Sequence, residues 1–173
     1  NFRSHTAQAF YKSKQKQIIR LHISGNDTQD EAVIRFIPEA TAGFDPRLDA
    51  RKLMVEQQEH PMLFVLDHNH QTPMAINSCM PATDSLSIPL GIRTGKAGMY
   101  QLAPGENTSD YPLYIHDQKR GIVQKLNTSS GYRFSSSEGT HNHRFRLIST
   151  NRPLPEQSQT SQHMYASGQT VYI

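Results

Sequence analysis

The sequence of 173 residues contains no tryptophan and a single cysteine, Cys79. One cysteine excludes an internal disulfide bond and any metal site built from two cysteines. Without tryptophan, the chain lacks the largest aromatic side chain that can stack on a sugar ring. It also lacks an apolar run of about 18 residues, so no membrane-spanning helix is expected.

Apolar residues are few, and the basic residues are dispersed. A hydrophobic fraction of 35% predicts a thin core, such as the one between two packed β-layers. The net charge of +3 is small, and the only basic cluster lies near the start, at Lys12, Lys14, Lys16 and Arg20. Because nucleic-acid binding needs a concentrated basic patch, we interpret this cluster as a solvated edge and expect no nucleic-acid partner.

Signatures of catalysis are also missing. The chain has no Gly-x-Ser-x-Gly motif. Cys79 closely follows an apolar run at residues 74–76, which favours a buried thiol over a nucleophile. Two carboxylates across a cleft could hydrolyse a sugar, but a sequence does not fix their separation. We therefore predict that the chain is not an enzyme, and a hydrolase is the least favoured alternative.

Short apolar runs bounded by turn residues dominate the chain. Residues 78–104 contain three prolines and three glycines, a density that no long helix tolerates. About eleven such runs recur at a spacing of roughly 8–12 residues, which is typical of an all-β fold. We predict two antiparallel sheets packed face to face, a β-sandwich of the jelly-roll or immunoglobulin-like type. The expected strands lie at residues 17–24, 32–37, 52–55, 61–66, 74–80, 86–90, 97–103, 111–116, 121–126, 132–135 and 143–148.

The apolar residues of these strands should form the core. In the first strand, Ile19, Leu21 and Ile23 alternate with polar residues and so share one face. The complete expected core consists of Ile19, Leu21, Ile23, Val33, Phe36, Phe64, Leu66, Ile76, Leu90, Tyr100, Leu102, Ile115, Phe134, Phe145 and Leu147.

Composition divides the chain into four segments. A leading polar segment at residues 1–16 precedes the β-sandwich domain at residues 17–150. Residues 151–163 are rich in Pro, Ser, Gln and Thr, which indicates a linker. Residues 164–173 contain a Ser-Gly turn followed by the start of a further strand.

An ordered set of motifs resembles a known family. The motifs are I-R-L-H-I-S-G-N-D-T-Q-D-E-A-V-I-R-F, A-T-A-G-F-D-P-R-L-D-A-R-K-L-M, A-I-N-S-C-M-P, S-I-P-L-G-I, K-A-G-M-Y-Q-L, L-Y-I-H-D, S-G-Y-R-F-S and H-R-F-R-L-I. Across residues 18–148 they resemble the β-sandwich domain that precedes type IX secretion sorting domains in adhesin-like surface proteins of Bacteroidetes. Two positions depart from that pattern: Leu48 replaces a more usual aromatic residue, and Cys79 lies in a run that is usually closer to N-A-L-P.

The resemblance implies a secreted or cell-surface protein with several domains. Residues 164–173 resemble the opening of the sorting domain itself, here cut short. The expected partners are neighbouring domains of the same polypeptide. The expected function is a non-catalytic, adhesin-like accessory module, which acts as a scaffold or binds a surface protein or a glycan. The alternative is a carbohydrate-binding module with structural calcium.

Four tyrosines are candidate ligand-binding residues because they lie on or beside expected strands: Tyr100, Tyr111, Tyr114 and Tyr132. An exposed tyrosine ring can stack on a sugar, whereas a buried one fills the core, and the sequence leaves both alternatives open.

Acidic residues gather in two expected loops and are candidate calcium ligands: Asp27, Asp30, Glu31, Asp45 and Asp49. Calcium takes six to eight oxygen ligands from flexible loops. The same residue types also cap turns through bonds to the backbone. No cofactor other than calcium is expected.

Histidines occur as two pairs, His68 with His70 and His141 with His143. Residues two apart on a strand face the same way and could share a metal ion if the two loops met. The alternative is that all four are exposed loop residues.

Overall fold

The computed structural model describes residues 18–55, 59–81, 84–107 and 111–155, and this part of the chain is all strand and loop, with no helix. The all-β prediction is therefore confirmed. The strands are β1 (Ile18–Gly25), β2 (Thr28–Phe36), β3 (Ala50–Arg51), β4 (Met62–Leu66), β5 (Pro73–Cys79), β6 (Ser85–Thr94), β7 (Gly98–Asn107), β8 (Leu113–Asp117), β9 (Ile122–Lys125), β10 (Tyr132–Ser136) and β11 (Gly139–Thr150). The predicted segments 1–16 and 164–173, and most of the linker, lie outside the described residues.

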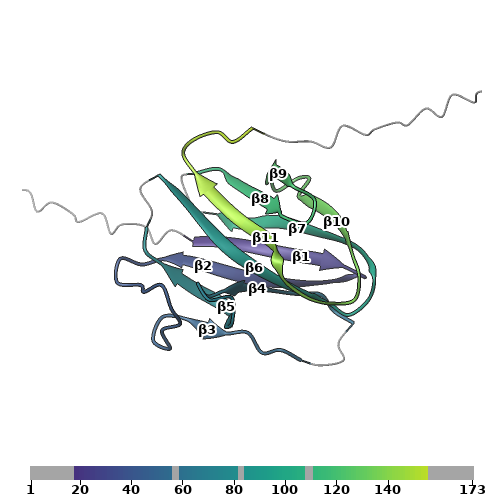
Figure 1. Ribbon diagram of the computed structural model, residues 1–173, viewed down its shortest axis with the longest axis horizontal. Helices are drawn as coiled ribbons and strands as arrows, with labels where there is room; N and C mark the ends of the chain where they lie inside the picture. Colours follow the sequence, from purple (N-terminus) through teal and green to yellow (C-terminus); the bar gives the residue numbers. More distant parts are fainter. Residues whose placement is uncertain (1–17, 56–58, 82–83, 108–110, 156–173) are drawn as a thin grey trace, which may run out of the picture.

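The strands form one hydrogen-bonded sheet rather than the two separate sheets expected from the sequence. Its order is β10-β7-β1-β2-β5-β4-β6-β11-β8-β9, with β3 paired to β5 (Figure 1). The β4–β5 pairing is what makes the sheet continuous, although it consists of only two residue pairs, Val65 with Met74 and Leu66 with Pro73. The continuous sheet curls into a shape that is close to a barrel.

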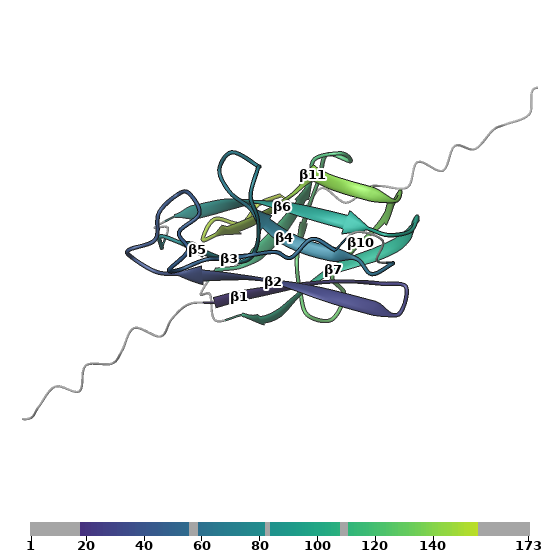
Figure 2. The same ribbon diagram turned by 90° about the horizontal axis from the view of Figure 1, so that it is seen from below.

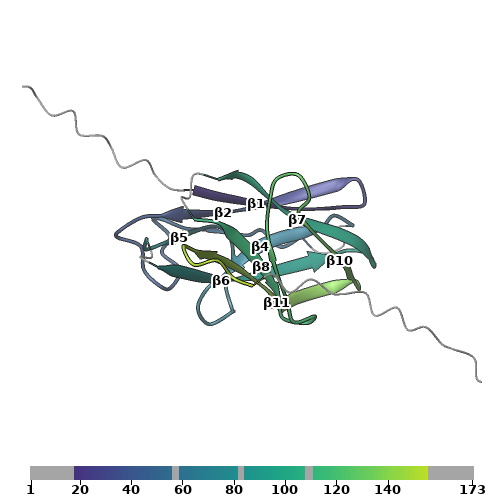
Figure 3. The same cartoon turned by 90° about the horizontal axis from the view of Figure 1, so that it is seen from above.

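The curled sheet encloses a single core. Figures 2 and 3 show β1 and β2 on one side of the molecule and β6 and β11 on the other. Side chains from both sides belong to one buried cluster, in which Leu21 of β1, Leu90 of β6 and Leu147 of β11 are fully buried. Apolar burial by opposite halves of the sheet therefore holds the curl together.

The core differs from the expected one at several positions. Val33, Phe36 and Ile76 are only half-buried, and Phe64 and Leu66 are buried outside the main cluster. In β2, Ala32 and Ile34 point inward instead, because they lie directly opposite the buried Leu21 and Ile19 of β1. Side chains of a strand alternate between faces, so the inward direction of Ile34 turns Val33 outward.

Local sequence explains the hairpin between β1 and β2. Asn26 and Asp27 have φ angles of 52° and 58°. Two consecutive positive φ angles match a type I′ turn, whose twist suits a two-residue hairpin, and Asn and Asp tolerate this conformation better than most residues.

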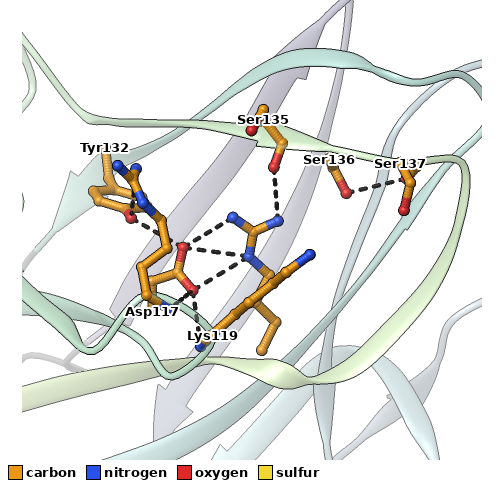
Figure 4. A network of polar contacts seen from close by, with 8 residues as sticks. Asp117, Lys119, Tyr132, Ser135, Ser136 and Ser137 are labelled. Atoms are coloured by element: carbon orange, nitrogen blue, oxygen red, sulfur yellow. Dashed lines mark hydrogen bonds and ion pairs between the residues drawn. The ribbon is translucent and has the colours of Figure 1, made fainter.

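The ends of the sheet path are linked by buried side chains. Figure 4 shows Asp117, at the end of β8, and Tyr132 of β10 in one polar network. Arg144 of β11 donates to Asp117 Oδ2 at 2.9 Å and to the carbonyl oxygen of Ser135 at 2.8 Å. Asp117 and Arg144 are 0% and 6% exposed, and their strands β8 and β11 are neighbours in the sheet. The bonds from Tyr132 to Asp117 and from Arg144 to Ser135 are therefore the ones that join the two ends inside the protein.

Candidate functional site

A cleft of about 620 Å³ lies between the end of β5 and the beginning of β6. It forms because β4 is short. Within β6, only Leu90–Arg93 pairs with β4. The earlier part of β6, Ser85–Pro89, pairs with β11 alone among the described residues. The corresponding part of β5 pairs with β2 instead. The two strands therefore diverge where β4 ends at Leu66, and the cleft occupies the space between them.

The deep surface of the cleft is apolar. Leu66, Ile88 and Ala40 line it and are 3–5% exposed. Met80, which also lines the cleft, is 62% exposed at its edge. An apolar concave surface with an exposed apolar rim is typical of a binding site for a small ligand or an apolar side chain.

Arg146 of β11 supplies a fixed positive charge at the cleft. Its Nε donates to Ser87 Oγ at 2.8 Å, and its Nη2 donates to the carbonyl oxygen of Ser87 at 3.2 Å. These two bonds hold the guanidinium beside β6. Its Nη1 has no hydrogen-bond partner in the part of the chain that the structure describes, so that nitrogen remains able to donate to a ligand.

His70 adds a second polar group to the cleft wall. It lies in the turn between β4 and β5 with a φ angle of 58°, and its backbone N–H donates to the carbonyl oxygen of Asp67 at 2.9 Å. Its ring Nδ1 is buried and has no partner within the described residues. The His70 ring stacks on that of His143, with centroids 4.9 Å apart.

The two histidine pairs of the sequence thus meet, but through one member of each pair. His68 contacts Asn69 instead, and His141 contacts the carbonyl oxygen of Ser137. Among residues 18–55, 59–81, 84–107 and 111–155, no three His, Cys, Asp or Glu side chains come together as a metal-binding group.

Asp67 is the acidic residue of the cleft lining. Burial opposes ionisation of its carboxyl group, but hydrogen bonds from the backbone N–H groups of Gln71 and Thr72 outweigh that effect and lower its pKa. The carboxylate is therefore used to shape the turn.

Cys79 lines the cleft as a protonated thiol. Burial, followed by the negative charge of Asp49, raises its pKa to about 11. The thiol donates to Asn77 Oδ1 at 2.9 Å. A nucleophilic cysteine needs the thiolate form, which this environment disfavours at neutral pH.

The candidate calcium ligands of β1 and β2 are separated from one another. Asp27 is exposed at the tip of the β1–β2 turn. Asp30 forms an ion pair with Lys52 at 2.5 Å and accepts a bond from the Leu63 N–H at 2.7 Å. Glu31 forms an ion pair with Arg20 at 2.7 Å.

The other two candidate ligands, Asp45 and Asp49, do meet in the loop between β2 and β3. Asp49 accepts bonds from the N–H groups of Asp45 and Ser78, each at 2.7 Å. Side-chain and backbone hydrogen bonds from Arg47 lower the pKa of Asp45. The oxygens of this pair thus shape the loop, and the calcium site remains a prediction.

The four candidate tyrosines do not form a common surface. Tyr100, Tyr114 and Tyr132 are 2–3% exposed, and Tyr111 is half-buried. Tyr100 and Tyr132 thus fill the core, which is one of the two alternatives that the sequence left open, and Tyr114 is buried outside the core cluster. Sequence reasoning did not identify Arg146 or Ser87 as site residues. Both lie in motifs of the family resemblance, H-R-F-R-L-I and S-I-P-L-G-I, but the resemblance assigns a role to neither.

Comparison with known proteins identifies a family. Residues 1–148 match the family described as a domain of unknown function, DUF8693. No curated protein and no solved structure matches the chain. Within the described residues, no helix is long and apolar enough to cross a membrane. Because the match covers most of its 173 residues, the chain belongs to the DUF8693 family.

Proposed function

We propose that the chain is a non-catalytic accessory module of an exported surface protein, and that it binds its partner or ligand in the cleft between β5 and β6. The observation that carries the proposal is the cleft itself. Its volume of about 620 Å³ lies within the range of roughly 300–1,000 Å³ that is typical of small-molecule sites. Its apolar floor is rigid because Leu66 and Ile88 also belong to the strands that build the core.

The chemistry of the lining supports binding rather than catalysis. The Cys79 thiol is protonated at neutral pH, and the Asp67 carboxylate is committed to backbone hydrogen bonds. Neither group matches the activated nucleophile or the general base that hydrolysis requires. The export of the protein and its role beside neighbouring domains rest on the resemblance in the sequence.

Fluorescence titration with N-phenyl-1-naphthylamine, a neutral apolar dye, tests the proposal. The wild-type chain should bind the dye saturably. Ala42 is exposed on the cleft wall, so A42W should fill the cleft and weaken binding at least about tenfold. The matched control is A97W, because Ala97 is also exposed but lies in the turn between β6 and β7.

The control variant should bind the dye like the wild type. Absence of saturable binding, or equal binding by A42W and the wild type, would contradict the location of the site. A urea midpoint for each variant establishes that all three chains are folded.

A further inference from the structure

The two charged groups that line the cleft differ in how far the protein's own atoms already satisfy their hydrogen bonding. The permanent cation is Arg146, and the acidic lining residue is Asp67. The Asp67 carboxylate accepts two backbone bonds on Oδ1, from Gln71 at 2.8 Å and from Thr72 at 3.2 Å, and a hydrogen bond from the Thr72 side chain also lowers its pKa. Nη1 of Arg146 has no partner among the described residues. A ligand that enters the cleft therefore meets an unpartnered guanidinium nitrogen beside a carboxylate that already has three hydrogen bonds.

Arg146 is also positioned before any ligand arrives. Two of its nitrogens bond the side chain and the backbone of Ser87. A guanidinium that is already fixed loses little side-chain entropy when it binds an anion, and its bonds to carboxylates are charge-assisted. The buried, unpartnered Nδ1 of His70 is a second donor in the tautomer that carries its proton there.

The backbone of β6 argues against a peptide that adds to the sheet as a strand. Pro89 has no N–H group to offer, and the carbonyl oxygen of Ser87 already accepts a bond from Arg146. Prolines and charged side chains of this kind protect a strand edge from further pairing. The occupant must therefore be recognised by its shape and charge and not by its backbone.

We infer that the cleft binds a small molecule with an apolar body and one carboxylate. The body lies against Leu66 and Ile88, and the carboxylate accepts hydrogen bonds from Arg146. This inference rests on the proposed function, and it adds the chemical class of the ligand to the location of the site.

Displacement of bound N-phenyl-1-naphthylamine by 4-phenylbutyrate and by 4-phenylbutanol tests the inference. The two competitors share the same apolar body and differ in the charged group. The carboxylate should displace the dye at a concentration about tenfold lower than the alcohol, since a charge-assisted bond is stronger than a neutral one.

Substitutions at Arg146 should reduce that preference. R146Q should abolish it, and R146K should retain part of it. A dye titration of each variant supplies the dissociation constant against which its two displacements are compared. The matched control is R133Q, which removes an exposed arginine from β10, outside the cleft lining, and should keep the full preference.

The outcomes separate the two proposals. Equal displacement by both competitors, or a preference that persists in R146Q, would overturn the inference while the binding cleft stands. A chain that does not bind the dye in the cleft would overturn both.

Discussion

The hydroxyl group of Tyr132 donates a hydrogen bond of 2.9 Å to Oδ2 of Asp117 inside the protein. Tyr132 belongs to β10 and Asp117 to β8, which lie near opposite ends of the sheet path. Because the described residues form no backbone ladder between these strands, the side chains close the curl. The same carboxylate accepts bonds from Arg144, so it serves both the ion pair and the closure.

Replacing Tyr132 with Phe should lower the free energy of unfolding by about 1–2 kcal/mol, because it removes one bond to a buried carboxylate. Urea denaturation measures the loss. The matched control is Y114F: Tyr114 is also buried, but within the described residues its hydroxyl accepts only a long bond of 3.4 Å from the Leu154 N–H. It should change the free energy by less than about 0.5 kcal/mol. Equal losses in the two variants would show that Tyr132 does not close the sheet.

Stability should also depend on pH through Tyr132. Burial, with the hydrogen bond and negative charge of Asp117, raises its pKa from 10.0 to about 12. Above pH 10 the unfolded chain loses the Tyr132 proton while the folded protein keeps it. The contribution to stability is thus complete below pH 10 and is lost between pH 10 and about 12. Urea midpoints measured from pH 9 to 11.5 should fall more steeply for the wild type than for Y132F, and parallel curves would refute the assignment.

Much of the strand pattern could be predicted from the sequence because strict alternation fixes both a strand and its buried face. Ile19, Leu21 and Ile23 are an example, since all three are 0% exposed. The expected strand at residues 143–148 was too short because the polar residues before it lie at an irregularity between His141 and Phe145, where alternation fails. The expected strand at residues 52–55 was misplaced. It pairs at Ala50–Arg51 instead and leaves Leu53 83% exposed.

The single sheet and the cleft could not be predicted in the same way. Both depend on which strands β4 pairs with and over what length. The expected strand at residues 61–66 ends at Leu66, as β4 does, but its apolar sequence does not identify its partners. The roles of Arg144 and Arg146 illustrate the same difficulty. They alternate with Phe145 and Leu147 in identical fashion, yet Arg144 pairs with Asp117, 27 residues away, and Arg146 reaches Ser87, 59 residues away. Such partners are set by strand order and not by local pattern.

Cys79 should react slowly with iodoacetamide in the folded protein. Its pKa is raised from 9.0 to about 11, so at pH 8 the thiolate fraction falls by about 100-fold relative to an unperturbed cysteine. The rate of alkylation, followed by mass spectrometry, should rise by at least that factor in 8 M urea. A folded protein that reacts as fast as the unfolded chain would mean that the thiol is active, and it would reopen a catalytic role for the cleft.

The contact between Gly91 and Phe64 gives a packing prediction. These residues lie directly opposite each other on β6 and β4, and a Cβ atom on Gly91 would lie 1.9 Å from the Phe64 ring. The ring is 1% exposed and cannot move away freely. G91A should therefore lower the free energy of unfolding by about 1–3 kcal/mol. The matched control is G43A, since a Cβ atom on Gly43 meets nothing within 4 Å.

A double-mutant cycle identifies the cause of that loss. F64L in the wild type should be destabilising because it removes buried aromatic volume. In the G91A background the same change makes room for the new methyl group. The double variant should therefore lose less free energy of unfolding than the sum of the two single-variant losses, by at least about 0.5 kcal/mol. Urea denaturation of the four chains measures the coupling. Strict additivity would mean that the methyl group strains the β6 backbone rather than the ring, and that Phe64 does not require a glycine opposite it.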